Sequence, residues 1–537
     1  MLARGDTSPA PNLRNPPGQF HLPACRRPSM LAKDTFIFLN QSQTLESVGW
    51  NCTAPKDLVS RLWRYNLHYF EDLNAFNASK RSHWHSDLMC CWVKDNPPCK
   101  GVGWEPYPTS LRIVNWIKWY GKGNALSENC VESLAVQARW LAKRLEWHLL
   151  GNHLFANAKA LIHAGCFFSG DEAEYWLERG LDIISQQLHV QMLSDGGHFE
   201  LSTMYHAIFV EDLLDLLNLA NFYPGAISEQ NRLLWIDAVS RALQWLMGMI
   251  HPDGEIAYFN DAAVAVAPSP KELVKFANRL GLHSEQATNR LTHFAESGYI
   301  RLGSDKAVVF ADVGRVGPDY QPGHAHADTL SFELSLHDHR VFVNSGISEY
   351  GSGPNRQFER GTEAHNTVVV NHRNSADVWS GFRVGRRGMP KDLIITETSN
   401  LVVVSCSHDG YKWLPGRPIH RRTWAFSEGQ LVISDQIDGY CETADAYLHL
   451  HPSISISSIS ERVWLLELPG GKLTLVEVEI GDSELIPSYY APEFGKRLKS
   501  WTLKLGLEKL CSCVRITWDY GEQKENHASF WDPSRSD

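Results

Sequence analysis

The hydrophobic pattern changes its period near the middle of this chain of 537 residues. In the first half, apolar residues return about every 3.6 positions, which is the repeat of an amphipathic helix. This repeat predicts helices over residues 131–150, 156–168, 172–190, 207–222 and 231–250. Because short loops with Gly, Pro or Asp separate them, we expect helical hairpins arranged in a toroid or a solenoid.

Beyond about residue 297 the pattern indicates short strands instead of helices. Runs that are β-branched or alternate between apolar and polar residues occupy 299–313, 329–336, 340–344, 367–370, 392–406, 430–437 and 447–450. Turn residues separate these runs. Many closely spaced strands predict an antiparallel β-sandwich for the second half of the chain.

The predicted domain boundaries follow from this change of pattern. Residues 1–45 are expected to be a poorly ordered N-terminal tail, residues 46–290 the helical domain and residues 291–537 the β-sandwich. No low-complexity linker separates the two halves. This favours a fixed interface, and ligand sites are common between domains.

Composition excludes some classes of function. The chain has 51 basic and 61 acidic residues, which argues against nucleic-acid binding. No window reaches the roughly 18 apolar residues of a membrane span. The first 30 residues lack the apolar segment of a secretory signal, so a cytoplasmic location is expected, or a periplasmic or secreted one if the start, with a second methionine at Met30, is misassigned.

The densest cluster of chemically active side chains is GHAHAD, residues 323–328. If this segment is a strand, His324 and His326 point to the same face, because side chains alternate along a strand. One imidazole is then suited to bind a metal ion while the other faces a substrate. His365, just before another predicted strand, is a plausible third metal ligand.

Polar clusters also occur in the helical half. Asn152 and His153 lie where a helix is expected to begin, so N-capping by Asn152 is an alternative to a catalytic role. The segment DGGHFE, residues 195–200, is followed by Tyr205 and His206 at another predicted helix start. A buried tyrosine with a satisfied hydroxyl is the structural alternative for Tyr205.

Taken together, these motifs resemble those of the heparinase II/III-like polysaccharide lyases. The resemblance rests on WRYNLHYF (63–70), GNH (151–153), DGGHFE followed by Tyr205 and His206, GHAHAD, and AHNT (364–367). It runs from about residue 50 to at least residue 450. It implies an incomplete (α/α) toroid followed by an antiparallel β-sandwich.

The resemblance also implies a reaction. Such lyases remove the C5 proton of a uronic acid and expel the sugar linked at its O4, which leaves an unsaturated product. By carry-over, Asn152, with His153 and His324, matches the group that neutralises the substrate carboxylate, and such donors also stabilise the developing negative charge. Tyr205 matches the general acid, and Tyr205 or His324 is the base, depending on the uronic epimer. The polysaccharide, such as heparan sulfate, another glycosaminoglycan or an exopolysaccharide, is not predicted.

Further binding roles are implied in the same way. Glu200 and His206 near Tyr205, and Tyr350 and Arg360 in the second half, are expected to bind the substrate. For Glu200, orienting Tyr205 or His206 is the alternative. For Tyr350 and Arg360, packing within loops is an equal alternative.

The resemblance implies one structural divalent metal ion, zinc or calcium, and no organic cofactor. Its ligands would be His326, His365 and Asn344. The family usually has an aspartate where this chain has Asn344, and a neutral amide is a poorer zinc ligand than a carboxylate.

Two other functions remain open. A glycoside hydrolase requires two facing carboxylates, whereas the clusters here are rich in His, Asn and Tyr. A non-catalytic protein of exopolysaccharide biosynthesis could keep the fold without activity. The presence of Asn152, Tyr205 and His324 favours a lyase, and Asn344 mildly favours the non-catalytic alternative. The sequence does not indicate an oligomeric state.

Overall fold

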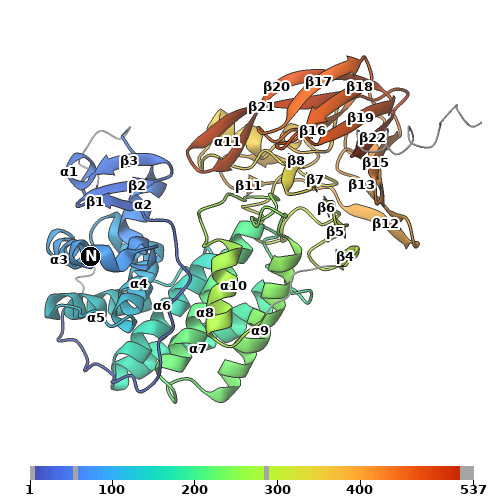
Figure 1. Cartoon of the computed structure of the whole chain (residues 1–537). Coiled ribbons are helices and arrows are strands. Elements are labelled where there is room, and N and C mark those ends of the chain that lie inside the picture. The colour runs from blue at the N-terminus through green and yellow to red at the C-terminus, as the bar shows by residue number, and fades with distance from the viewer. Residues whose placement is uncertain (1–5, 52–57, 284–288, 520–537) are drawn as a thin grey trace, which may run out of the picture. The chain divides into compact units, whose positions relative to one another are not determined.

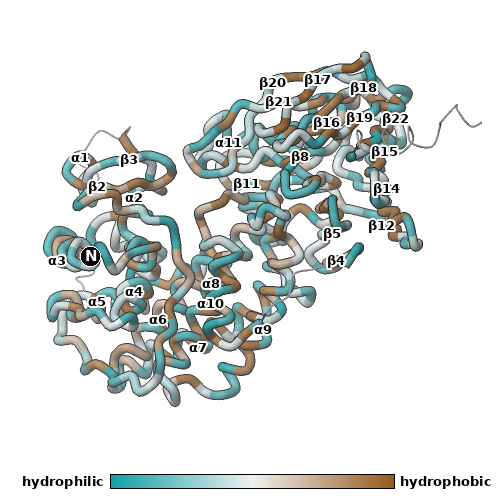
Figure 2. The backbone as a smooth tube through the Cα atoms, in the orientation of Figure 1, coloured by the Kyte–Doolittle hydropathy of each residue, from teal (hydrophilic) through white to brown (hydrophobic). Residues whose placement is uncertain are grey.

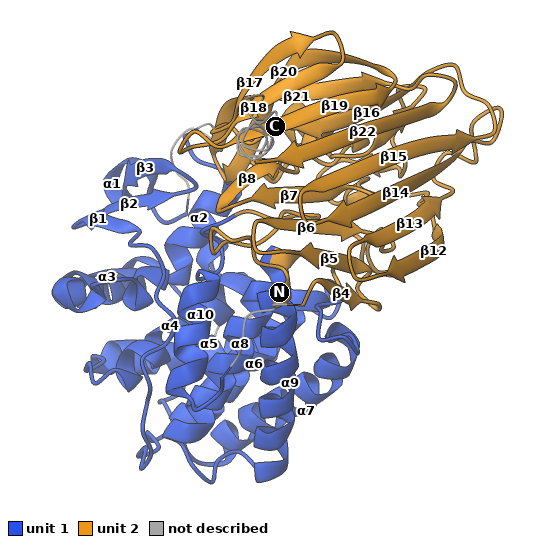
Figure 3. Ribbon diagram, turned by 45° about the vertical axis from the view of Figure 1, so that its right-hand side comes forward, with its two compact units in different colours: residues 1–199, 204–247, 264–285 blue, residues 200–203, 248–263, 286–537 orange. Residues whose placement is uncertain are grey.

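The computed structural model describes residues 6–51, 58–283 and 289–519 (Figure 1). The chain divides into two compact units (Figure 3). Unit 1 comprises residues 1–199, 204–247 and 264–285, and unit 2 comprises residues 200–203, 248–263 and 286–537. The last boundary between the units, at residues 285 and 286, lies close to the domain boundary predicted at residues 290 and 291. However, two short segments of the predicted helical domain, 200–203 and 248–263, belong to the second unit.

Unit 1 is mainly helical. Its α-helices are α1 Leu45–Val48, α2 Arg61–Tyr69, α3 Ser82–Asp95, α4 Pro106–Gly121, α5 Glu128–Ala142, α6 Gly151–Phe167, α7 Asp171–Gln191, α8 Thr203–Phe222, α9 Glu229–Gly248 and α10 Pro270–Arg279. The 3-10 helices are η1 Glu71–Asn74, η2 Ala78–Arg81 and η3 Val102–Trp104.

Helix α6 lies at the centre of unit 1. Every residue from Leu154 to its end at Phe167 is buried, and α6 packs against α4, α5 and α7. A Cβ atom at Gly165 would lie 2.6 Å from the backbone nitrogen of Leu177 in α7. The two helices can therefore approach this closely only because Gly165 has no side chain. This packing fits the predicted helical hairpins.

The described part of the N-terminal segment differs from the predicted tail. Strands β1 Met30–Ala32, β2 Thr35–Phe38 and β3 Gln41–Thr44 form an antiparallel sheet. Upstream, the backbone N–H of Arg14 donates to the carbonyl of Phe167, and that of Gly18 donates to the carbonyl of Phe222. These bonds fix the segment to the ends of α6 and α8. The hydrophobic pattern did not predict this attachment, because the segment contains no long amphipathic element.

Unit 2 consists mainly of antiparallel strands. They are β4 Leu291–Phe294, β5 Tyr299–Gly303, β6 Ala307–Asp312, β7 Phe332–Leu336, β8 His339–Phe342, β9 Val368–Val370, β10 Val378–Trp379, β11 Arg383–Val384, β12 Pro390–Glu397, β13 Val402–His408, β14 Ile419–Ser427, β15 Gln430–Asp438, β16 Ala444–His449, β17 Ser455–Ser460, β18 Val463–Glu467, β19 Leu473–Ile480, β20 Asp482–Glu493, β21 Lys496–Gly506 and β22 Cys511–Trp518. Helix α11 Pro354–Glu359 and the 3-10 helix η4 Thr362–Ala364 lie between β8 and β9.

The strands of unit 2 form three larger sheets and the hairpin β10-β11. The sheet orders are β4-β5-β6-β7-β8, β20-β21-β16-β9 and β12-β13-β14-β15-β22-β19-β18-β17. Side chains from all three sheets share one hydrophobic core. Strand β14 shows the expected alternation, with every second residue buried, and Figure 2 shows the hydropathy along the chain. The fold class is therefore the predicted (α/α) toroid followed by an antiparallel β-sandwich.

Several predicted elements have different limits. The helix expected over 131–150 ends at Ala142, and residues 143–150 form turns and irregular backbone. Leu150 and Gly151 both have positive φ, so a regular right-handed helix cannot pass through them. The run 299–313 is the hairpin β5-β6, and 392–406 contains β12 and β13. The segment 323–328 is a loop between β6 and β7, not a strand.

No helix among the described residues is both long and apolar enough to cross a membrane.

The buried imidazole of His68 gives a prediction for stability. Its Nδ1 accepts from the Trp92 indole at 2.9 Å, and its Nε2 lies 3.0 Å from the Trp50 carbonyl, so the neutral ring satisfies both contacts. Burial, with the charge of Arg112, lowers the pKa of His68 to about 3. The unfolded chain binds a proton below about pH 6.5 that the folded chain excludes, so the free energy of unfolding falls as pH falls.

We expect this histidine to remove ~2 kcal/mol of stability between about pH 7 and about pH 5. The variant His68→Gln, which keeps a donor and an acceptor but does not titrate, should show a smaller loss of melting temperature over this range. The exposed His83→Gln is the control and should behave like the parent. An equal loss in His68→Gln and the parent would contradict the assignment.

Candidate functional site

A buried carboxylate, Asp261, is at the centre of a polar cluster in unit 2. Its side chain is fully buried. Its Oδ2 lies 2.7 Å from His324 Nδ1, and its Oδ1 lies 2.8 Å from His326 Nε2. Arg356 of α11 donates to both carboxylate oxygens. The two motif histidines therefore contact the same carboxylate, although the segment that carries them is a loop and not the strand on which the prediction of a shared face depended.

The charge of Asp261 is stabilised by its partners. Burial alone would raise the pKa of this carboxyl. The charge of Arg356 and the hydrogen bonds from His324, His326 and Arg356 outweigh burial and hold the pKa well below its usual range. The carboxylate is therefore ionised, and in the neutral histidines it selects the tautomers whose N–H groups face it.

His324 is the more accessible of the two histidines. Its side chain is 16% exposed, whereas that of His326 is 1% exposed. Because Nδ1 donates to Asp261, the neutral ring carries its lone pair on Nε2. The ring lies beside Phe382 and Tyr350, with centroid distances of 5.6 and 6.0 Å. The arrangement gives an oriented imidazole that can accept a proton.

Arg360 holds the loop that carries these histidines. Its guanidinium is buried and donates to the carbonyl of Ala325 at 3.0 Å, and also to the carbonyls of Ser380 and Gly381. Burial, together with the charge of Arg356, lowers the pKa of Arg360 to about 10. Through these bonds Arg360 fixes the backbone of the loop. Its role in binding substrate stays a prediction. Tyr350 is only partly buried.

The predicted metal ligands also lie together in unit 2. His326 Nδ1 and His365 Nε2 are 3.3 Å apart. Asn344 donates from Nδ2 to the Tyr258 carbonyl, so its Oδ1 accepts from His365 Nδ1 at 3.0 Å. Since the remote nitrogens of both rings donate, the two facing nitrogens carry lone pairs when both imidazoles are neutral.

This donor set fits a metal ion only in part. Two converging imidazole nitrogens suit zinc, but Asn344 contacts the ring nitrogen of His365 that faces away from His326. Among the described residues, no three His, Cys, Asp or Glu side chains are placed to share one metal ion. The residues therefore do not provide the three protein ligands that the resemblance implies, and the metal ion stays a prediction.

Backbone contacts fix the position of Asn344. Glu333 of β7 accepts from the backbone N–H groups of Asn344 and Tyr258, both at 2.8 Å. Burial raises the pKa of Glu333 to about 7. Two residues further on, Gly346 has a φ of +70°, and a Cβ atom there would lie 2.2 Å from the Ala491 carbonyl. Only glycine allows this loop to approach β20.

In unit 1, Asn152 and His153 lie in the first turn of α6. Leu150 occupies the N-cap position, so Asn152 is not the capping residue. His153 Nδ1 lies 3.1 Å from Oε1 of Glu146, and its ring lies 4.5 Å from that of Tyr107. The side chain of His153 is 31% exposed, so the turn presents a polar surface.

The start of α6 is held by two amide side chains. Asn157 donates to Glu146 Oε2 at 3.0 Å and accepts from the Glu146 backbone N–H at 2.8 Å. Gln191, at the end of α7, donates to the carbonyl of Gly151 and contacts His198 Nε2 at 3.2 Å. The segment 195–200 thereby connects to the turn that carries Asn152.

Tyr205 and His206 lie in the first turn of α8, as predicted. Tyr205 is 8% exposed, and His206 is fully buried. His206 Nδ1 accepts from the backbone N–H of His198, and Nε2 lies 2.8 Å from the Ala242 carbonyl. Burial lowers the pKa of His206 to about 4, so the ring is neutral near neutrality. These contacts explain His206 structurally, and its binding role stays a prediction.

Glu200 belongs to unit 2. It lies in the segment 200–203, in which Ser202 Oγ donates to the Asp261 carbonyl at 2.5 Å. Glu200 is 1% exposed. Its role in binding or in orienting other side chains stays a prediction.

Sequence reasoning missed Asp261, Arg356 and Glu146. Asp261 is 63 residues away from His324 along the chain, and Arg356 is 95 residues away from Asp261. No local motif connects such positions. The one weak signal is the polar pair Asn260-Asp261, which follows the buried apolar run 256–259.

Comparisons with known proteins agree with the division of the chain into two units. A model of the heparinase II/III N-terminus matches residues 44–285, and a model of the heparinase II/III-like C-terminal region matches residues 286–515. The crossover between the two models coincides with the final boundary between the units.

Two curated relatives share about a quarter of the aligned residues with this chain. A heparin-sulfate lyase of Bacteroides stercoris is 26% identical over 317 residues, which is 54% of this chain and 44% of the relative. A heparin-sulfate lyase of Bacteroides thetaiotaomicron is 25% identical over 334 residues, which is 53% of this chain and 47% of the relative. The match thus spans less than half the length of these two relatives.

Solved structures share the fold. A crystal structure of heparinase III gives a TM-score of 0.67 at 18% identity, covering 85% of this chain and 76% of the other. A chondroitin AC lyase of Streptomyces coelicolor gives a TM-score of 0.54 at 12% identity, covering 91% of this chain and 79% of the other.

The two family models together match most of the length of this protein, from residue 44 to residue 515, and the chain therefore belongs to the heparinase II/III family.

Proposed function

We propose that this protein is a polysaccharide lyase that cleaves the bond at O4 of a uronic acid by β-elimination. The observation that carries the proposal is the orientation of His324 by the ionised carboxylate of Asp261, at 2.7 Å, with the imidazole partly exposed. Family membership and the names of the curated relatives support the same reaction.

The reaction requires removal of a proton beside a carboxylate. Such a proton is a weak acid, so the substrate carboxylate must be neutralised and the developing charge stabilised by preorganised donors. We assign this role to Asn152 and His153, with help from His324. The side chains of Asn152 and His153 are partly exposed at the start of α6, where Glu146 orients the histidine.

Proton transfer is assigned to Tyr205 and His324. Tyr205 protonates the leaving O4 oxygen. The C5 proton goes to His324 or to the phenolate of Tyr205, whichever is on the side of the ring that carries this proton. Electrons from the C5–H bond form the C4–C5 double bond while the C4–O4 bond breaks. Asp261 stabilises the imidazolium of His324 without accepting its proton.

Heparan sulfate is the first substrate to test. The curated relatives are named as heparin-sulfate lyases, and heparan sulfate is a polymer with 4-linked uronic acids. Other glycosaminoglycans and uronic-acid exopolysaccharides carry the same reactive unit. Glu200, His206, Tyr350 and Arg360 are proposed to bind the sugar directly or through residues that do.

The alternative of a non-catalytic family member rests on one observation. Asn344 stands where the resemblance implies an aspartate, and its oxygen contacts the nitrogen of His365 that faces away from His326. We propose that these two histidines hold a divalent metal ion only weakly, and no step of the reaction is assigned to such an ion.

The variants Tyr205→Phe and His324→Ala test the mechanism. A correctly placed acid or base contributes roughly 100-fold to 10,000-fold to the rate, so each variant should lose at least about 100-fold in kcat. The measurement is ultraviolet absorbance of the conjugated unsaturated uronate, with heparan sulfate, hyaluronan, chondroitin sulfate and alginate as substrates. Tyr223→Phe removes another buried phenol and should keep full turnover. Full activity in Tyr205→Phe would refute the assigned mechanism.

The variant Asp261→Asn tests the positioning of His324. An amide cannot accept hydrogen bonds at both positions, so we expect kcat to fall roughly 10-fold to 100-fold with KM little changed. Because the change leaves Arg356 buried without its carboxylate, the double variant Asp261→Asn/Arg356→Met is also measured. Asp253→Asn, which removes the ion pair between the partly exposed Asp253 and the buried Arg340, is the control. Unchanged kcat in folded Asp261→Asn would exclude this positioning role.

The variant Asn344→Asp tests the metal site. A carboxylate that rotates toward His326 and His365 supplies a charged third ligand, so zinc retained per chain after dialysis should rise. The measurement is elemental analysis by mass spectrometry. Adding His365→Ala to Asn344→Asp should abolish the gain. One zinc ion per chain already retained by the parent protein would contradict weak binding.

A further inference from the structure

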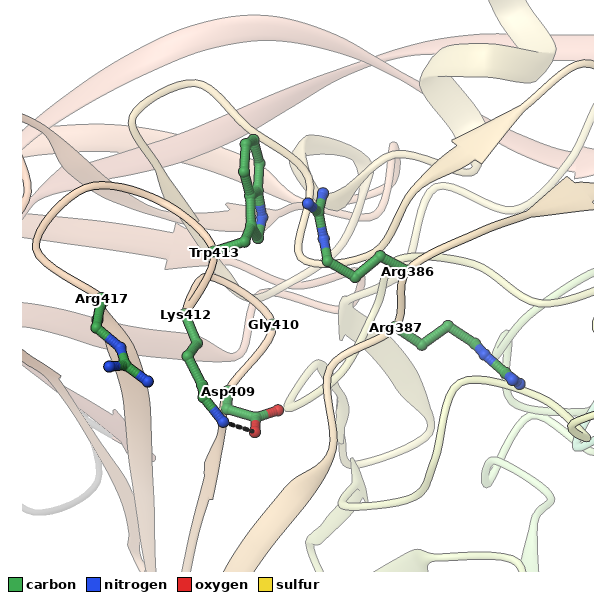
Figure 4. Close-up of a pocket in the computed structure, with 7 residues that line it drawn as sticks. All are labelled: Arg386, Arg387, Asp409, Gly410, Lys412, Trp413 and Arg417. Atoms are coloured by element: carbon green, nitrogen blue, oxygen red, sulfur yellow. Dashed lines mark ion pairs between the residues drawn. The ribbon is translucent and has the colours of Figure 1, made fainter.

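A pocket of about 360 Å³ lies on unit 2. None of the residues that line it has been assigned a catalytic role. Its walls come from the segment after β11 and from the loop between β13 and β14 (Figure 4). The lining residues are Arg386, Arg387, Asp409, Gly410, Lys412, Trp413 and Arg417.

The pocket is positively charged. Arg386 pairs with Asp377 at 2.5 Å, Arg387 pairs with Asp319 at 3.1 Å, and Asp409 is shared by Lys391 and Lys412. With Arg417, five cations therefore meet three carboxylates. The whole chain carries a formal charge of −10, so this excess of positive charge is local. An anionic group is the complementary ligand.

Arg417 adds the least compensated of these charges. It is exposed, and its side chain has no ion-pair partner among the residues that the structure describes. In Figure 4 its guanidinium lies on the same side of the loop as Lys412. A planar guanidinium can bind a carboxylate or a sulfate through two parallel hydrogen bonds.

Trp413 supplies an apolar surface beside the charges. Its side chain is 44% exposed, and the guanidinium carbon of Arg386 lies 3.8 Å from its ring centroid. Figure 4 shows the two side chains directed toward each other. The indole offers a broad apolar surface on which the C–H face of a sugar ring can pack. Indole and guanidinium groups together suit an acidic sugar.

The framework of the pocket is tightly packed. A Cβ atom at Gly410 would lie 2.5 Å from the Ser375 carbonyl, and one at Gly388 would lie 2.6 Å from the Cα of Gly410. The backbone N–H of Met389 donates to Asp409 Oδ1 at 2.8 Å, which joins the two walls. The buried Tyr411 hydroxyl donates to the Val368 carbonyl at 2.7 Å. These contacts preorganise the loop, which reduces the entropy lost on binding.

A short hairpin connects this pocket to the surroundings of His324. Phe382 lies in the turn between β10 and β11, and its ring packs against His324. Arg386 follows four residues later, so its Cα lies within about 14 Å of that of Phe382. A polysaccharide of several units is long enough to contact both places.

We propose that this pocket, which we call the Trp413 pocket, binds an acidic sugar unit of the polysaccharide through its carboxylate or sulfate group. The identification of the ligand as a polysaccharide rests on the proposed function. The pocket would hold the polymer outside the catalytic residues and lower KM for long chains more than for short ones.

Binding is tested first, apart from turnover. The double variant Trp413→Ala/Arg417→Ala is made in the Tyr205→Phe background, and its affinity for a heparin-derived octasaccharide is measured by calorimetry at low and high salt. Loss of a charged hydrogen bond and of the stacking surface should weaken binding at least about tenfold at low salt. The difference should shrink at high salt, because screening weakens the contribution of Arg417.

Matched controls use other exposed side chains of unit 2. Trp501→Ala removes a tryptophan that is 46% exposed, and Arg462→Ala removes an arginine that is 50% exposed. Together these changes should leave the affinity unaltered. Thermal unfolding confirms that each variant is folded. Equal affinity of the Trp413→Ala/Arg417→Ala protein and its background would overturn the proposal, as would the same loss in the control variant.

Turnover then separates this proposal from the proposed function. In the background with Tyr205 intact, the pocket variant should raise KM for the long polymer severalfold, with kcat unchanged and little effect on a tetrasaccharide. If the protein degrades a polymer but the pocket variant binds the octasaccharide with unaltered affinity, the pocket proposal is wrong and the lyase proposal stands. Weakened binding without turnover of any polymer would keep the pocket and overturn the lyase. Competition by inorganic sulfate as effective as that by the octasaccharide would overturn recognition of a sugar.

Discussion

Pairing of the buried Asp261 carboxylate is the interaction on which the polar site of unit 2 depends. An ionised carboxylate without exposure to water is strongly unfavourable unless opposite charge and hydrogen bonds compensate it. Arg356 supplies the charge, and His324 and His326 supply hydrogen bonds. Helix α11, the loop 323–328 and the segment 248–263 are thereby held at one point. The carboxylate thus sets both the geometry and the tautomers of the site.

The same interaction separates two kinds of histidine. His326 is 1% exposed and contacts Asp261 and His365, and burial lowers its pKa to about 4, so it is a neutral element of the interior. His324 shares the carboxylate but is 16% exposed. Solvent exposure therefore distinguishes these two histidines, although both contact the same carboxylate. This difference is the reason for assigning proton transfer to His324.

Unit 1 orients its polar turn by different means. Gln191 and Asn157 use neutral amides to hold the start of α6, and Glu146 contacts His153. Because α6 is buried over most of its length, its first turn has little freedom to shift. Asn152 is thereby presented from a fixed helix end. Such rigidity suits the role proposed for Asn152, which is to stabilise a developing charge without reorganisation.

The sequence by itself determined the fold class and suggested most of the residues of the proposed site. Hydrophobic periods of 3.6 and 2 are local, so helices such as α7, α8 and α9 and strands such as β9 and β15 were predicted nearly to their ends. The motif around His324 was also evident locally. The sequence did not place this motif in a loop. It also did not indicate that strands β1, β2 and β3 would form a sheet in the predicted tail, or that residues upstream of them would bond to helix ends.

Only the tertiary structure decided which side chains act together. Asp261 and Arg356 are 95 residues apart, and their pairing depends on burial, which no local pattern encodes. Asn344 was expected beside His326, but its bond to the Tyr258 carbonyl turns its oxygen toward the remote nitrogen of His365. The Trp413 pocket likewise arises from two loops that become adjacent only through folding. The sequence specifies the type of each residue, whereas the pairing of charges that are distant along the chain follows from the packing of the whole unit.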